Sequence, residues 1–206
     1  MALVKLNNRG VRNVSTFGSV GVGSMIFIKK LTASASSTLS FVDGTSDVVL
    51  DDTYKEYLFT FKNLHPSANG AQFSFQGNAA GGSGYNETIT SSSFRTYHNE
   101  GDTDTTLGYT TDGDQGQGTA FQKFSEVTIG SDNDQCGSGF LRLFNPSSTT
   151  FVKHFIGKFD VYDPDDYAMT GYFAGYFNTT SAIDEIQFKF ASGNIDAGDI
   201  CLYGIN

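Results

Sequence analysis

Aromatic residues at every second position constrain the fold of this chain more than any other feature of its sequence. Tyr57, Phe59 and Phe61 alternate with polar residues, and the segment 186–190 repeats that period of two near the C-terminus. A period of two places neighbouring side chains on opposite faces of a strand. These segments therefore predict strands of a sheet with one buried face and one wet face.

The same alternation, interrupted by turns rich in Gly, Asn, Asp and Ser, predicts about ten strands and no helix. Only 17% of the residues are charged, whereas long amphipathic helices need many such residues on their wet face. The expected strands are 25–31, 38–42, 48–50, 54–64, 73–75, 121–129, 140–144, 151–161, 167–178, 186–190 and 200–205, with short strands 94–98 and 106–110 inside an irregular segment, 77–118. We therefore expect an all-β, antiparallel β-sandwich that is jelly-roll-like, because several strands are long and the loops are unequal.

The N-terminal part of the chain differs from the rest in pattern and in charge. Residues 1–24 keep neither periodicity, which predicts an extended arm that becomes ordered on another surface, ahead of a sandwich domain at 25–206. Five basic residues precede the first acidic one, Asp43, although the whole chain has a net charge of −9. We expect Lys5, Arg9 and Arg12 to dock the arm on an acidic partner. In the alternative reading, basic residues such as Lys29 and Lys30 guard a wet strand edge.

Charge and hydropathy also exclude some partners. A net charge of −9 predicts no binding to nucleic acid. No apolar run approaches the roughly 18 residues of a membrane span, so we expect no membrane insertion. The opening residues break their apolar run at once, which predicts no secretory signal and synthesis in the cytosol. Cys136 and Cys201 are then expected to be reduced thiols, and a late disulfide between them stays open.

No catalytic motif is present. The nucleophile-elbow, zincin, Walker and dinucleotide patterns are all missing, and the three histidines lack metal-ligand spacing. We therefore expect no enzyme activity and no cofactor. Paired aspartates in loops, such as Asp102 with Asp104 and Asp112 with Asp114, suit either a cation or ordinary turns, and turns are the preferred reading.

Tyrosines offer a glycan-binding alternative, because a flat ring with a polar tip suits saccharides. If Phe173 and Phe177 face the core, Tyr172 and Tyr176 must face outward. The candidate stacking residues are Tyr172, Tyr176, Tyr85 and Tyr109. Packing under loops or against a neighbouring subunit is the competing interpretation of these rings.

Three segments resemble modules of tailed-phage tail-fibre and related particle proteins. They are 54–64 with the turn that follows it, 139–146, and the ending 193–205, which reads I-x-x-G-x-I-x-L-Y-G-I. The resemblance covers roughly residues 25–206 and is weakest in 77–118. It implies a β-sandwich displayed on a virion, often as an oligomer. The short N-terminal arm departs from typical fibres, which favours a capsid decoration protein or a small tail-attached subunit.

The resulting hypothesis is a non-enzymatic virion structural protein, docked by its arm, exposed at the virion surface and assembled in the host cytoplasm. Its expected partners are capsid or tail proteins and further copies of itself; a trimer is preferred, and a monomeric sandwich remains an alternative. A carbohydrate-binding adhesin for host surface glycans is the second hypothesis, and a polysaccharide hydrolase is the third.

Overall fold

The computed structural model describes residues 16–17, 20–21 and 24–206, and the regular structure of this part consists entirely of strands. The strands are β1 (Thr16–Phe17), β2 (Val20–Gly21), β3 (Met25–Thr32), β4 (Leu39–Val42), β5 (Glu56–Pro66), β6 (Phe73–Ala79), β7 (Ile89–Asn99), β8 (Thr105–Tyr109), β9 (Gln115–Gly118), β10 (Gln122–Lys123), β11 (Gly137–Phe144), β12 (Lys153–Tyr162), β13 (Tyr167–Phe177), β14 (Ile183–Phe190) and β15 (Ile195–Ile205). The predicted all-β class is confirmed.

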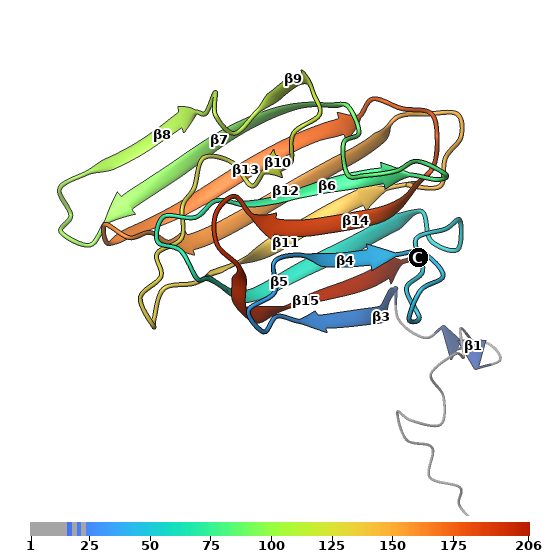
Figure 1. Cartoon of the computed structure of the whole chain (residues 1–206), viewed down its shortest axis with the longest axis horizontal. Coiled ribbons are helices and arrows are strands. Elements are labelled where there is room, and N and C mark those ends of the chain that lie inside the picture. Colours follow the sequence, from blue (N-terminus) through green and yellow to red (C-terminus); the bar gives the residue numbers. More distant parts are fainter. Residues whose placement is uncertain (1–15, 18–19, 22–23) are drawn as a thin grey trace, which may run out of the picture.

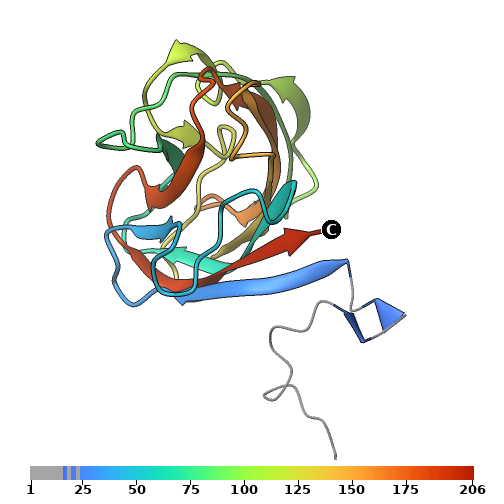
Figure 2. The ribbon, with the colours of Figure 1, turned by 90° about the vertical axis from the view of Figure 1, so that its right-hand side faces the viewer.

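Two antiparallel sheets form a sandwich. The nine-stranded sheet has the order β3-β15-β5-β11-β12-β13-β7-β8, with β9 also paired to β7, and the four-stranded sheet has the order β10-β6-β14-β4. Figure 1 shows the smaller sheet lying across the larger one, with β3 and β8 toward opposite ends of the larger sheet. Seen from the side in Figure 2, the sheets curve around the space between them.

Eight of these strands have jelly-roll connectivity. In chain order they are β3, β4, β5, β6, β10, β11, β14 and β15. β3 pairs with β15, β4 with β14, β5 with β11, and β6 with β10. A long antiparallel ribbon folded over itself in this way is a jelly roll. The expected jelly-roll-like sandwich is therefore the observed architecture.

The remaining strands of the large sheet come from two insertions in the jelly roll. One contributes β7, β8 and β9 between β6 and β10, and the other contributes β12 and β13 between β11 and β14. The insertions join each other through the pairing of β13 with β7 along the whole of both strands. They extend the large sheet far beyond the edge of the small one (Figure 1).

Phenylalanine rings fill the space between the sheets. Phe61 of β5 has its ring centroid 5.4 Å from that of Phe73 of β6, 5.1 Å from Phe124 and 5.3 Å from Phe188 of β14. Most of these pairs meet edge to face, the arrangement that aromatic quadrupoles favour. The period of two in β5 and β14 thus builds the core as predicted.

Residues 48–50 are a loop rather than the expected strand. The preceding turn places Ser46 and Asp47 at positive φ, and the Leu50 amide donates a hydrogen bond to the Asp43 carboxylate at 2.8 Å. This turn brings the Val48 and Leu50 side chains into the core without strand pairing. Buried apolar residues two apart were therefore a misleading signal.

The expected strand 121–129 shortens to Gln122 and Lys123. Ser125 has a φ of 66° and ends the extended conformation, so Phe124 and Val127 both reach the core from an irregular segment. Asparagine and glycine are the usual occupants of such a position, and a serine does not indicate it.

The strand expected at 151–161 begins at Lys153, so Phe151 does not share the inner face of β12. The Ser148 hydroxyl accepts the amide of Phe151, which lies in a bend before the strand with its side chain 68% exposed. Lys153 takes the inner position instead, fully buried, and its ammonium donates to the carbonyls of Phe151 and Thr179 at 3.0 Å each.

The segment 77–118 is more regular than expected. The short strand predicted at 94–98 is part of the eleven-residue β7, and the strand predicted at 106–110 is β8. The N-terminal arm, by contrast, lies mostly outside the described residues. Within it only the short pair β1 and β2 is described, and Lys5, Arg9 and Arg12 lie outside the described part.

Candidate functional site

The outward face of the nine-stranded sheet carries an unusual density of apolar side chains. Because Tyr57 and Phe59 point inward on β5, Leu58 between them points outward, and the same alternation holds along the other strands. We define the outer apolar band by its residues: Met25, Phe27, Leu58, Phe94, Leu107, Tyr109, Phe140, Phe144, Ile156, Tyr172, Tyr176, Tyr203 and Ile205.

Exposure sets this face apart from the rest of the described surface. Seven large hydrophobic side chains in residues 24–206 are exposed, and six of them belong to the outer apolar band; Phe151 is the seventh. They include Phe27 at 54%, Ile156 at 48% and Leu107 at 71%. Single exposed apolar residues are ordinary, whereas a contiguous group marks an interaction surface.

One row of the band is a ladder of stacked side chains across β12, β13, β7 and β8. Lys158 lies opposite Tyr172, Tyr172 opposite Phe94, and Phe94 opposite Tyr109. The rings of Phe94 and Tyr172 stack at 4.9 Å with an interplanar angle of 10°, and the Lys158 ammonium lies 5.5 Å from the centre of the Tyr172 ring. Tyr172 is thus held between its two cross-strand neighbours.

The opposite end of the band lies on β3 and β15. Phe27 contacts Tyr203 edge to face, with ring centroids 5.6 Å apart. Tyr203 is half-buried, and burial raises the pKa of its phenol. The phenol therefore stays neutral at physiological pH. At the β8 end, the Tyr109 hydroxyl donates to the Asp114 carboxylate, which raises the pKa of Tyr109 as well.

Charged groups on this face largely neutralise one another. Lys30 lies 3.4 Å from an oxygen of Asp199, and Arg142 lies 3.2 Å from an oxygen of Glu56. Such exposed pairs add little stability. Their effect is to leave the face without a strong net charge, in contrast to the acidic chain as a whole.

A shallow hollow of about 480 Å³ lies within this face, beside the ladder. Its lining includes Tyr176, His154, Ile156, Thr90 and Ser92, and the rings of His154 and Tyr176 meet at 5.7 Å. The hollow combines one aromatic wall with two hydroxyl groups. Such a lining suits a small polar ligand with an apolar face.

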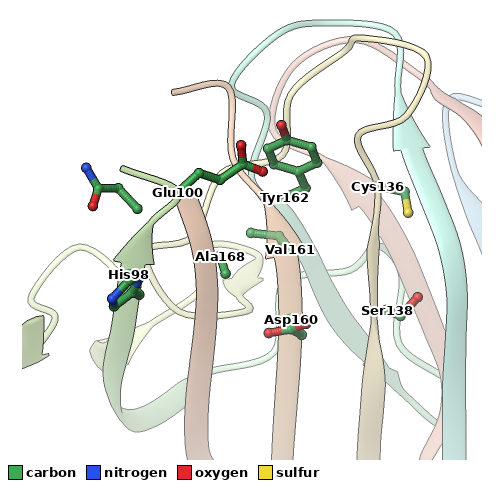
Figure 3. Close-up of a pocket in the computed structure, with 9 residues that line it drawn as sticks. His98, Glu100, Cys136, Ser138, Asp160, Val161, Tyr162 and Ala168 are labelled. Atoms are coloured by element: carbon green, nitrogen blue, oxygen red, sulfur yellow. The ribbon is translucent and has the colours of Figure 1, made fainter. Parts of the chain in front are cut away.

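A second depression, of about 390 Å³, lies at the end of the same sheet where β7 and β12 terminate (Figure 3). It contains His98, Glu100, Asp160 and Cys136. His98 and Cys136 occupy one row at the two ends of four adjacent strands, so about 14 Å separates them at 4.8 Å per strand. That separation is too long for a thiol and an imidazole to exchange a proton.

Neither does this depression activate its thiol. Burial raises the pKa of Cys136, which disfavours the nucleophilic thiolate. Tyr162 donates to the carboxylate of Asp166 at 3.0 Å, which raises the pKa of Tyr162 to about 12. Cys136 and Tyr162 are therefore held in their protonated forms.

The loop aspartates are engaged in local contacts. Asp102 accepts from His98, Asp104 from Tyr167, and Asp112 from Lys123. Among the residues that the structure describes, no three His, Cys, Asp or Glu side chains gather as metal ligands would, and no helix is long and apolar enough to cross a membrane. The expectation of no cofactor stays a prediction.

The four tyrosines proposed from the sequence do not form one site. Tyr172, Tyr176 and Tyr109 share the outward face of the large sheet, whereas Tyr85 lies against the small sheet and donates to Glu185 of β14 at 2.7 Å. Tyr172 and Tyr176 are four residues apart on β13, which spans about 13 Å.

The sequence reasoning missed the other members of the outer apolar band, above all Phe27, Phe94 and Ile156. A signal for them existed. The run 25–28 is apolar at four consecutive positions, and 140–144 is apolar on both sides of Arg142, a pattern typical of strands covered on both faces. Comparison of the chain with protein-family models, with curated proteins and with solved structures found no match.

Proposed function

We propose that this chain is a non-enzymatic structural subunit of a phage particle, exposed at the virion surface as a capsid decoration protein or a small tail subunit. The observation that carries the proposal is the gathering of six of the seven exposed large hydrophobic residues on one sheet face. Apolar surface concentrated in this way marks an interaction site, and a structural subunit uses such a site for contact with other proteins.

Two further observations support this proposal. The segments 54–64, 139–146 and 193–205 resemble modules of tailed-phage particle proteins, and the strands that they form belong to the jelly roll itself. In addition, the depression at the end of the large sheet separates His98 from Cys136 and leaves the thiol protonated. A structural role accounts for a site without an activated nucleophile.

Quantitative mass spectrometry of purified particles tests the proposal. The chain should be present at a fixed ratio to the major capsid protein. A ratio comparable to one would identify a decoration protein, and a ratio near that of portal or tail subunits would identify a tail component. Absence of the chain from purified particles would refute the structural role.

The same measurement extends to docking by the arm. We propose that Lys5, Arg9 and Arg12 contact an acidic surface of the particle. A chain that lacks residues 1–20 should fold with an unchanged melting temperature and be lost from particles. Equal incorporation of the truncated and full-length chains would contradict docking by the arm.

A carbohydrate-binding adhesin is the second candidate, and the hollow beside Tyr176 favours it because hydroxyl groups and an aromatic ring line the same concavity. Tyr176→Ala should then lower adsorption to host cells without lowering thermal stability. Tyr172→Ala is the matched control, because the ring of Tyr172 is already covered by Phe94 and Lys158 and has no free face for a sugar.

A further inference from the structure

The outward sheet face that carries the outer apolar band is large enough for a stable protein interface. Seven spacings of about 4.8 Å separate β3 from β8, and strands of about ten residues span roughly 33 Å, so the face covers on the order of 1,000 Å². A standard interface buries about 800 Å² on each partner. The band also continues from one end of the sheet to the other, from Phe27 on β3 to Tyr109 on β8.

The charges on this face suit a partner that resembles the chain itself. The paired positions that point outward include four cations, Lys30, Lys62, Arg142 and Lys158, and three carboxylates, Glu56, Asp160 and Asp199. The whole chain has a net charge of −9, so its remaining surface repels a second copy. On the outward face that repulsion is absent.

The band is also arranged for contact with side chains rather than with flat ligands. Along the ladder, Tyr172 stacks face to face on Phe94 and has Lys158 on its other side, so these two rings present their edges outward. Ring edges and aliphatic side chains such as Ile156 interdigitate with a matching protein surface, as in the core of an interface.

We infer that the outer apolar band is the surface through which copies of this chain associate with one another. Ile156 lies on the central strand β12 and Phe94 lies toward the β8 end, and the compensated charges around them allow close approach. The proposed function leaves the partner of this face open, and this inference identifies it as another copy of the chain. The inference does not depend on where the chain sits in a particle.

Light scattering after size-exclusion chromatography, over a broad range of loading concentrations, tests the association. The wild-type chain should have a mass of at least twice its 22.2 kDa. Ile156→Asp and Phe94→Asp should each weaken association at least tenfold, because a carboxylate would be buried at the contact. Arg142 lies opposite position 156 and can pair with the new carboxylate in the free subunit, so the fold should survive.

Phe151→Asp is the matched control, since Phe151 is more exposed than Ile156 or Phe94 but lies in a bend outside the band. It should associate like the wild type, and circular dichroism should show that all three variants are folded. A wild-type chain that is monomeric at every concentration would overturn the inference. So would loss of association in Phe151→Asp equal to that in Ile156→Asp. Either result leaves the particle-composition test of the proposed function unaffected.

Discussion

Glycine positions in β12 and β13 determine how closely the phenylalanine core approaches the large sheet. A Cβ atom on Gly157 would lie 2.1 Å from the Phe173 ring, and one on Gly175 would lie 2.8 Å from the Phe155 ring. Phe173 is itself surrounded by Phe124 and Phe155. The rings therefore rest on bare backbone, and the sheet has no spare volume beneath them.

We predict that Gly157→Ala destabilises the protein by about 1–3 kcal/mol, because the added methyl group overpacks the core and displaces the Phe173 ring. Urea unfolding of the variant and the wild type measures this difference. Gly108→Ala on β8 is the control, since a Cβ there meets nothing within 4 Å. Equal stability of the two variants would contradict the packing argument.

Tyr57 links the core to the loop beneath β5. Its ring is fully buried, and its hydroxyl donates to the Asp51 carbonyl at 3.0 Å. Burial, together with the nearby Asp51 carboxylate, raises the pKa of Tyr57 well above its usual range. Above about pH 10 the unfolded chain releases this proton while the folded chain retains it, so folding stability falls as pH rises.

Tyr57→Phe should reduce that alkaline loss. We expect the free energy of unfolding to fall from pH 9 to pH 11 in both proteins, since other tyrosines also have raised pKa values, and to fall less in the variant. Denaturant titrations at the two pH values give the comparison. An identical decrease in both proteins would show that Tyr57 does not contribute.

At the scale of elements, the side chain of Asn99 makes three hydrogen bonds in the turn of the β7–β8 hairpin. The side-chain carbonyl oxygen of Asn99 accepts hydrogen bonds from the backbone amides of Thr103 and Asp104 at 2.9 and 3.0 Å. The side-chain NH₂ group of Asn99 donates to the Thr103 hydroxyl. These bonds close the turn that connects β7 to β8. Among the described strands β8 pairs only with β7, and outside this hairpin its end is supported by the bond from Tyr167 to Asp104 and the bond from the Glu100 amide to the Asp166 carbonyl.

We predict that Asn99→Ala raises hydrogen exchange in β8 severalfold and leaves β12 unchanged, because local opening of an edge strand does not require global unfolding. The comparison belongs in the Ile156→Asp background, where association does not mask the amides of β8. Unchanged exchange at residues 105–109 would show that strand pairing alone holds the hairpin.

The elements that could be predicted from the sequence are those in which one face is apolar and the other polar. β5, β12 and β14 fit that pattern, and their inward residues form the core as expected. The pattern failed where apolar residues reach the core from irregular backbone. Val48 and Phe124 do so beside positive-φ positions at Asp47 and Ser125. Because neither of these residues is a glycine, the sequence does not indicate the turns.

The candidate site was harder to predict than the fold, because it depends on which strands become neighbours. Alternation placed Tyr172 and Tyr176 outward, but it could not place Phe94 beside Tyr172. That contact exists because two insertions in the jelly roll pair with each other. Pairing between segments so distant in the chain leaves no local trace in the sequence.

At the scale of the whole molecule, the fold separates two kinds of surface. The small sheet covers one side of the core, and the large sheet extends beyond it and presents the outer apolar band on its far side. The whole chain has 22 acidic and 13 basic residues, whereas cations and carboxylates are nearly balanced on that face. Association through the band is thus the arrangement that best combines apolar burial with low electrostatic repulsion.

Hydroxyl-radical footprinting of the assembled chain tests this account most directly, because it reports the exposure of individual rings. Phe27 and Phe94 lie at opposite ends of the band, and Phe151 is an exposed ring outside it. Relative to the Ile156→Asp subunit, the wild-type chain should show severalfold slower oxidation of Phe27 and Phe94 and equal oxidation of Phe151. Equal oxidation of all three rings in the two proteins would contradict the assignment of this face as the assembly surface.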